Sequence, residues 1–322
     1  MRFRDLPVRL KGSLLARRVA RLYRELQARS IVALPHAWLS EEFFTPDGVV
    51  GFAIPFYLAH PRLMRLERTQ MLEVEGAAEA ECRRILRHEA GHCLDEAYGF
   101  HRRARYRELF GNPRKPYPAS YKPKLDSRDH VINLAGWYAQ GYPVEDFAES
   151  FAVWLNPYLD WRSDYRGWPA LRKLEYIEEL MREIRGVPPP SSENTEVEPL
   201  HAITRTLRDH YAEKRAYFAW HWEENYDVGL RRIFSEDPEG APGPLAARFL
   251  RRSRVLLRAR IAEGTGVHTY AVDQLLRQMI ARAQELNLRM VDEAEVTIER
   301  LLVLLTMQTA TVLRVGYPKV AL

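Results

Sequence analysis

The spacing of hydrophobic residues predicts helices along most of the chain. Near the end, apolar side chains recur every three or four positions and so share one face of a helix: Val272, Leu275, Leu276, Met279, Ile280, Ala283 and Leu286. A further helix is expected to begin at Asp292. The same kind of pattern predicts helices over residues 11–29, 77–100, 127–140, 143–155 and 168–185.

Two early segments have the β-branched and aromatic content of strands. They are residues 31–39 and 49–58, and the turn-like sequence Thr45-Pro46-Asp47-Gly48 separates them. Pro55 within the second segment suits an edge strand, to which an extended peptide could add. The sequence therefore predicts an α+β fold that is mostly helical, with a small N-terminal β portion followed by an all-α helical domain.

A segment rich in proline and polar residues, 187–199, interrupts the helical pattern. Proline cannot continue a helix, and this composition offers little apolar surface to bury. We therefore expect a linker at residues 187–199, between a first domain at residues 1–186 and a helical domain of unknown role at residues 200–322.

Composition narrows the class of protein. With 322 residues, of which 46% are hydrophobic, the chain can form one large or two ordinary domains. A formal net charge of +5 is too mild to indicate nucleic-acid binding. The longest apolar stretch, residues 301–315, is interrupted by polar residues and is too short to predict a membrane span. Cys82 and Cys93 lie three turns apart on one expected helix, which indicates reduced core residues of a cytoplasmic protein.

The segment His88-Glu89-Ala90-Gly91-His92 has the pattern His-Glu-x-x-His within a predicted helix. Residues four apart on a helix project from one face, so both imidazoles can bind one Zn²⁺. The glutamate between them can reach a water on the metal. This motif predicts that His88 and His92 are metal ligands and that Glu89 is a catalytic base.

The position of Glu89 on the helix favours a metal site over a surface helix with incidental histidines. Glu89 lies in the middle of an apolar stripe, with His88 and His92 along one edge and Arg87 on the far side, among other arginines. A carboxylate facing a core costs several kcal/mol unless it is paired, and a metal ion with its water is an adequate partner. The stripe consists of Cys82, Ile85, Leu86, Cys93 and Ala97.

A zinc hydrolase needs a third protein ligand. The extended motif that ends in a third histidine is excluded, because Asp95 and Tyr98 stand where its glycine and histidine would be. A predicted second helix offers Glu145 and Glu149, four residues apart on one face at the boundary of a buried stripe. Spacing alone allows either carboxylate to bind the metal.

The segments His-Glu-Ala-Gly-His and Glu-Asp-Phe-Ala-Glu-Ser-Phe-Ala together resemble the gluzincin class of zinc peptidases. These segments especially resemble the branch with the catalytic domain of anthrax toxin lethal factor, and the chain also resembles bacterial zinc-binding metallopeptidases. The resemblance covers roughly residues 50–160 and implies a zincin-like catalytic domain. It implies one Zn²⁺ per chain, bound by His88, His92 and Glu145. Tyr138, seven residues before Glu145, would support the reacting carbonyl, and Glu149 would accept the N–H of a ligand imidazole, His88.

These residues predict a hydrolase that cleaves peptide bonds in a peptide or protein substrate, using metal-activated water and Glu89 as general base. The alternative is a non-catalytic zinc-containing protein that binds or regulates through its helical C-terminal domain. A structural zinc site normally fills all four positions with Cys or His and needs neither Glu89 nor Tyr138. Tyr106, Tyr117 and Tyr121 could line a cleft, although packing is the better interpretation for them.

Overall fold

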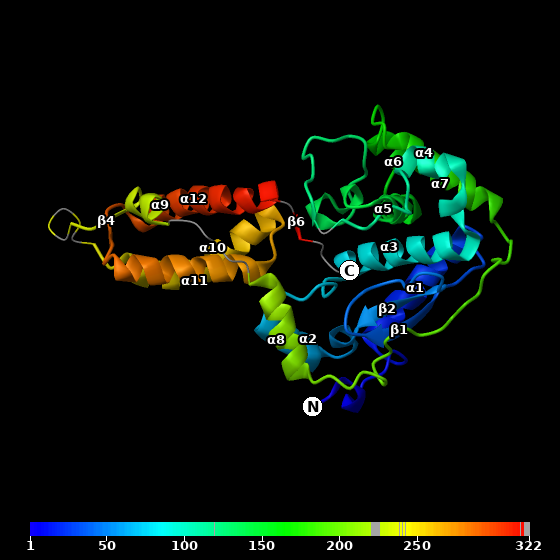
Figure 1. Cartoon of the computed structure of the whole chain (residues 1–322), viewed down its shortest axis with the longest axis horizontal. Helices are drawn as coiled ribbons and strands as arrows, with labels where there is room; N and C mark the ends of the chain where they lie inside the picture. The colour runs from blue at the N-terminus through cyan, green and yellow to red at the C-terminus, as the bar shows by residue number, and fades with distance from the viewer. Residues whose placement is uncertain are drawn as a thin grey trace. The chain divides into compact units, whose positions relative to one another are not determined.

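The computed structural model describes residues 1–118, 120–219, 226–237, 239, 241, 243–315 and 317–318, with side chains described up to residue 310. The chain forms two compact units (Figure 1). The first unit consists of residues 1–68, 74–207 and 316–322, and the second consists of residues 69–73 and 208–315. The prediction of a mostly helical α+β fold is confirmed by the order of elements.

The first unit holds the short strands and most of the sequence motifs. Its helices are α1 (Leu14–Ala28), α2 (Pro61–Met71, whose last turn belongs to the second unit), α3 (Glu79–Tyr98), α4 (Ala104–Phe110), α5 (Pro143–Leu155), α6 (Trp161–Asp164) and α7 (Leu171–Glu183). Its 3-10 helices are η1 (Phe3–Asp5), η2 (Phe56–Ala59), η3 (Phe100–Arg102) and η4 (Ala135–Gln140). Its strands are β1 (His36–Ser40), β2 (Gly51–Pro55), β3 (Ser120–Tyr121) and β6 (Tyr317–Pro318).

Strands β1 and β2 pair in parallel, with His36 opposite Gly51 and Ser40 opposite Pro55. The second predicted strand, residues 49–58, therefore forms only over Gly51–Pro55. Because the sheet has two strands, β2 lies at an edge, as Pro55 suggests, although every residue of the strand is buried. On the side away from β1, the backbone of Phe44 bridges to Ala53, since the turn after Phe44 brings the chain back beside the strand.

Helix α3 is the central helix of the first unit and carries the His-Glu-x-x-His segment. Before it begins, the guanidinium of Arg18 donates to the carbonyls of Gly76 and Ala77 at 2.8 and 2.9 Å. It ends at Gly99, whose left-handed conformation (φ 64°) allows its N–H to reach the Asp95 carbonyl. The predicted apolar stripe of α3 is buried throughout.

Arg87 departs from the sequence-based expectation. The helical pattern places it on the side of α3 away from the apolar stripe, where charged residues usually meet solvent, yet only 3% of Arg87 is exposed. Its guanidinium donates to both carboxylate oxygens of Glu25 in α1, at 2.7 and 2.9 Å. Helix α1 packs against α3, so α3 is covered on more than one face and the single-stripe rule does not apply to it.

Helix α5 packs against α3 with an unusually close approach. It begins at Pro143, where a missing N–H costs nothing, and its first turn contains Glu145 and Asp146, whose charges suit a helix N-terminus. A Cβ atom placed on Gly91 of α3 would lie only 2.9 Å from the Cα of Ala148 in α5. The glycine of the motif therefore allows the two helices that carry the candidate ligands to meet.

Residues 187–200 lie along the first unit and bind its strands through backbone groups. The indole of Trp38 donates to the Val197 carbonyl at 3.0 Å, and the amide of Leu200 donates to the Leu39 carbonyl at 2.8 Å. The amide of Val50 donates to the Glu193 carbonyl at 2.7 Å. The sequence predicts that residues 187–199 link two domains. Whether residues 1–186 fold without the rest of the chain stays a prediction.

The second unit is built from helices around its own hydrophobic core. Its elements are α8 (Leu207–Phe218, which begins at the last residue of the first unit), α9 (Asp227–Arg231), α10 (Ala246–Thr265), α11 (Thr269–Glu285), α12 (Ala294–Val315) and the paired two-residue strands β4 (Phe234–Ser235) and β5 (Arg289–Met290). The fully buried Asp273 of α11 binds Arg258 at 2.9 Å and Arg254 at 3.1 Å, both from α10. Two arginines of α10 are thus paired with a buried carboxylate within the unit.

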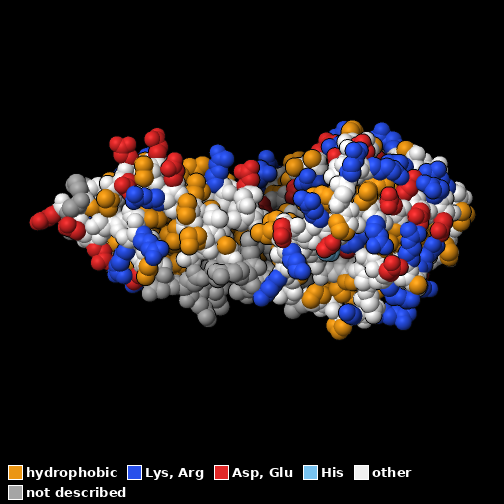
Figure 2. Space-filling view, turned by 90° about the horizontal axis from the view of Figure 1, so that it is seen from above, with side chains coloured by type: hydrophobic (Ala, Val, Ile, Leu, Met, Phe, Trp, Pro, Cys, Tyr) orange, Lys and Arg blue, Asp and Glu red, His pale blue; other side chains and the backbone are white. Residues whose placement is uncertain are grey.

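No helix in the described part of the chain is both long and apolar enough to cross a bilayer. Cys82 and Cys93 are both free thiols and both buried. On the face drawn in Figure 2, Lys and Arg side chains and Asp and Glu side chains both occur, which fits the mild net charge of the sequence.

Candidate metal centre

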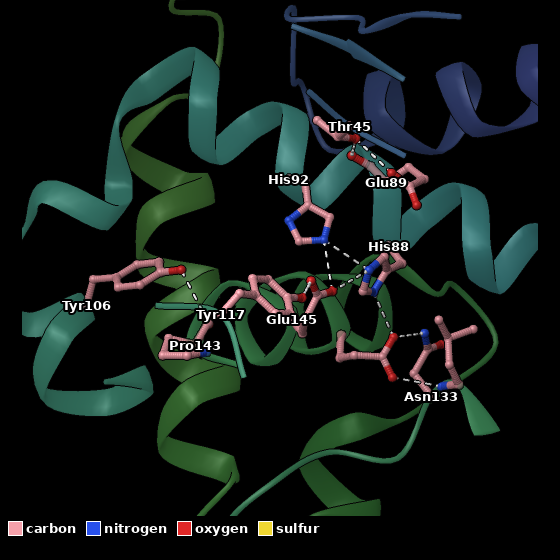
Figure 3. Close-up of polar contacts among 11 residues, drawn as sticks. Thr45, His88, Glu89, His92, Tyr106, Tyr117, Asn133, Pro143 and Glu145 are labelled. Carbon is pink, nitrogen blue, oxygen red and sulfur yellow. Dashed lines mark hydrogen bonds and ion pairs between the residues drawn. The ribbon is translucent and has the colours of Figure 1, made fainter. Parts of the chain in front are cut away.

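The two histidines of α3 lie side by side, one helical turn apart (Figure 3). Their Nε2 atoms are 3.0 Å apart. The His88 side chain is fully buried, whereas 15% of the His92 side chain is exposed. The helix thus directs both imidazoles to one point at the edge of the core.

Glu145 of α5 completes a cluster of three donors. Its Oε2 lies 3.1 Å from Nε2 of His88 and 3.2 Å from Nε2 of His92. Ligand atoms of a tetrahedral zinc ion, with bonds of about 2.0–2.1 Å, are roughly 3.3 Å apart, so this set fits such an ion. Among the described residues, no other group of His, Cys, Asp and Glu side chains is close enough together to hold a metal.

Glu149, one turn further along α5, lies behind His88. Its Oε1 accepts hydrogen bonds from Nδ1 of His88 at 2.9 Å and from the amide of Asn133 at 2.7 Å. Its Oε2 accepts the backbone N–H of Leu134 at 2.8 Å. The carboxylate is fully buried, and three donors hold it. It therefore fixes the orientation of the His88 ring, so that Nε2 faces the cluster.

The carboxylates shift the pKa values of this cluster. Burial alone would lower the pKa of His88, but hydrogen bonds to Glu145 and Glu149 raise it to about 10. Burial alone would raise the pKa of Glu145, but the imidazoles of His92 and His88 hold it well below its ordinary value. The cluster therefore favours a proton on His88 and a negative charge on Glu145.

We expect the apparent affinity for Zn²⁺ to rise with pH up to about 10. A metal ion binds the neutral imidazole and displaces the proton of His88, whose pKa of about 10 keeps that proton present near neutral pH. Each pH unit between about 6 and 9 should then strengthen apparent binding by roughly tenfold. Competition with a chelator at several pH values measures this. An affinity that stops rising near pH 6.5, the ordinary pKa of histidine, would contradict it.

Glu89 lies on α3 between the two histidines and is only 1% exposed. Its Oε2 accepts a hydrogen bond from Oγ1 of Thr45 at 2.7 Å (Figure 3). Burial raises the pKa of Glu89, and the neighbouring His88 and His92 oppose that rise. A carboxyl whose pKa is raised can take up and release a proton more readily near neutral pH.

Tyr138 stands beside the histidines. Its ring centroid lies 5.6 Å from that of His88, and 8% of the residue is exposed. Two residues with positive φ precede it, Gly136 (φ 73°) and Trp137 (φ 53°), so a tight turn directs the side chain toward the cluster. Burial and the nearby Glu145 raise the pKa of Tyr138 well above its ordinary value, so the phenol keeps its proton.

Three residues hold the carboxylates in and around the cluster, although the sequence does not identify them as partners. Thr45 binds Glu89, Asn133 binds Glu149, and the hydroxyl of Tyr117 donates to Oε1 of Glu145. None belongs to a motif, and each lies at least 16 residues along the chain from the carboxylate it binds. Tyr117 is one of the aromatic residues for which packing is the expected role.

We expect Gly91→Ala to weaken both the fold and metal binding. The new methyl group would meet the backbone of Ala148, so α5 must shift, and such overpacking typically costs about 1–3 kcal/mol. Denaturant unfolding and zinc titration measure the two effects. Gly264→Ala in α10 is the control, because nothing lies within 4 Å of the added Cβ, and it should stabilise by about 0.5–1 kcal/mol. Equal effects of the two substitutions would contradict the close-approach argument.

Two imidazoles from one helix and a carboxylate from another form the ligand chemistry of a zinc hydrolase. Residues 81–160, which include this cluster, match the model of a family described as "Putative zinc-binding metallo-peptidase". None of the curated proteins and none of the solved structures is significantly similar to the chain. The family match supports a peptidase-like function for the matched segment, and the finer likeness to the gluzincin class stays a prediction.

Proposed function

We propose that the chain is a zinc-dependent peptidase, in which His88, His92 and Glu145 hold the metal and Glu89 acts as general base. The observation that supports this most strongly is the make-up of the cluster. Among the described residues, three donor side chains converge, whereas a structural zinc site normally has four Cys or His ligands. Glu89 is buried beside the cluster and is not one of the three donors.

A bound Zn²⁺ would supply Lewis acidity and lower the pKa of a water toward neutrality. Glu89 would take a proton from the attacking water and later deliver it to the nitrogen of the leaving amine. Thr45 would hold one oxygen of Glu89 and so orient the carboxylate for this transfer. Tyr138, with its proton retained, would donate to the carbonyl oxygen as negative charge develops there.

The remaining contacts would maintain the geometry of the ligands. Glu149 would keep the N–H of His88 on Nδ1, which leaves Nε2 free of a proton for the metal. Asn133 and the backbone of Leu134 would in turn fix Glu149. The peptide or protein that the chain cleaves would bind beside these groups, with its carbonyl within reach of Glu89 and Tyr138.

Metal analysis of the purified full chain, followed by cleavage of an unbiased peptide library, tests this proposal. We expect one Zn²⁺ per chain and cleavage that a chelator abolishes and added zinc restores. Protein that contains no zinc after purification without chelator, and takes up none on titration, would refute it. Protein that binds zinc but cleaves no peptide would instead favour a non-catalytic protein that binds or regulates through its helical C-terminal part.

A further inference from the structure

The two oxygens of the Glu145 carboxylate have different partners. Oε2 faces Nε2 of His88 and Nε2 of His92 at 3.1 and 3.2 Å. Oε1 accepts a hydrogen bond from the hydroxyl of Tyr117 (Figure 3). One oxygen is therefore directed to the candidate metal position, while a neutral phenol occupies the other.

Tyr117 is held in place by the same helix that carries Glu145. Its ring stacks on that of Tyr142, with centroids 4.1 Å apart and planes inclined by 29°. Tyr142 is the residue that precedes the first turn of α5, and its hydroxyl donates to the carbonyl of Pro113 at 2.6 Å. The segment around Tyr117 is thus held at the start of α5, and Tyr142 lies within one helical turn of Glu145, whose carboxylate the phenol binds.

Tyr117 also lies near the second catalytic candidate. The neighbouring phenol of Tyr117 contributes to the raised pKa of Tyr138. Tyr117 is therefore close to Tyr138 as well as to Glu145, to which its hydroxyl donates a hydrogen bond.

We propose that Tyr117 is a positioning residue that restricts Glu145 to binding the metal through Oε2 alone. A carboxylate with both oxygens available can bind a metal through one or both, and a hydrogen bond to the ionised group is strong enough to select one mode. Single-oxygen binding leaves a coordination position for water or substrate, which a catalytic zinc site requires. This inference rests on the proposed metal site, and it does not require that the chain cleaves peptide bonds.

The test compares wild type with Tyr117→Phe in the full chain. Phenylalanine keeps the ring and its stacking on Tyr142 and removes only the hydroxyl, so the variant should fold, which circular dichroism and thermal unfolding verify. Zinc affinity is expected to fall roughly 10- to 100-fold, which is the usual effect of losing a hydrogen bond to a metal ligand. With Co²⁺ in place of zinc, visible absorption should weaken and X-ray absorption should gain a second carboxylate oxygen, because Glu145 becomes free to bind through both.

Tyr121→Phe is the matched control. Its hydroxyl donates to the Gly136 carbonyl at 2.8 Å, so the substitution removes a phenol from the same segment of chain without touching Glu145. We expect the Co²⁺ spectrum of this control to equal that of wild type. A change of the same size in both variants would show a general disturbance of the segment and would overturn the inference.

Two other results would also overturn it. Unchanged zinc affinity and an unchanged Co²⁺ spectrum in Tyr117→Phe would show that the hydroxyl does not control Glu145. A phenolate-to-metal absorption band in Cu²⁺-loaded wild type that disappears in Tyr117→Phe would show that Tyr117 is itself a ligand. Wild type that binds zinc but cleaves no peptide would refute the proposed peptidase activity while leaving the role of Tyr117 in place.

Discussion

Replacing Glu89 with Gln is expected to leave zinc bound while turnover falls by about 10²- to 10⁴-fold. The amide of Gln cannot take up the proton of the attacking water. It has nearly the same volume, however, and its oxygen can still accept the hydrogen bond of Thr45, so the buried side chain should keep its place. Elemental analysis gives the metal content, and cleavage of the best peptide from the library gives the rate.

Glu79→Gln provides the matched control for this substitution. Glu79 lies in the first turn of the same helix, where it pairs with Arg21 and Arg83 at 3.5 Å and is largely exposed. The Glu79→Gln variant should retain both zinc and activity. If Glu89→Gln loses its metal, Glu89 is a ligand and its assigned role as base is wrong. If its turnover is unchanged, another group accepts the proton.

Glu145→Ala is expected to lower zinc affinity more than Glu149→Ala does. The loss should be well over roughly 100-fold, which is the upper range for losing a residue that only hydrogen-bonds to a metal ligand. Its Oε2 is one of three donor atoms that lie within 4.8 Å of one another among the described residues. Alanine leaves two imidazoles, which is one ligand fewer than a catalytic zinc site uses. Competition against a chelator of known affinity measures the change.

Glu149→Ala should behave differently, because Glu149 orients His88 and does not face the cluster. We expect a loss of roughly 10- to 100-fold in zinc affinity. The backbone N–H of Leu134 and the amide of Asn133 would also lose their acceptor, so the free energy of unfolding should fall by about 1–3 kcal/mol. If Glu149→Ala is the variant that loses zinc outright, the two roles must be exchanged.

The helices that carry the site could be predicted well from sequence. Pro143 and the apolar spacing after it predict a helix over residues 143–155, and α5 has these bounds. The pattern around the histidines likewise predicts a helix over residues 77–100, close to the observed Glu79–Tyr98. These predictions succeed because local spacing and helix-end residues determine where such helices begin and end.

The predicted helix at residues 127–140 is wrong for a reason that local patterns cannot show. Only the 3-10 helix η4, Ala135–Gln140, forms there, and Gly136 and Trp137 interrupt its regular geometry. The side-chain amide of Asn133 and the backbone amide of Leu134 bind Glu149 instead. A tertiary hydrogen bond to a buried carboxylate has thus replaced the intrahelical bonds that the spacing favours.

Which glutamate faces the imidazoles also depends on distant packing. Glu145 and Glu149 share one face of α5, so spacing alone leaves either of them able to reach the metal. The contact between Gly91 and Ala148 sets how α5 crosses α3, and this crossing directs Glu145 to both Nε2 atoms. Glu145 and His92 are 53 residues apart in the sequence, so no periodic pattern can predict that they meet.

Residues 187–207 also affect the order in which the first unit can assemble while the chain is being synthesised. The amides of Phe3 and Arg4 donate to the carbonyls of Arg205 and Ile203, and the side chain of Arg2 reaches a carbonyl 202 residues later. Helices α3 and α5 precede residues 203–205 in the sequence, so both are synthesised before these partners. The metal cluster can therefore gather while the N-terminal residues still lack their partners, and closing this long loop is expected to be a late and slow step.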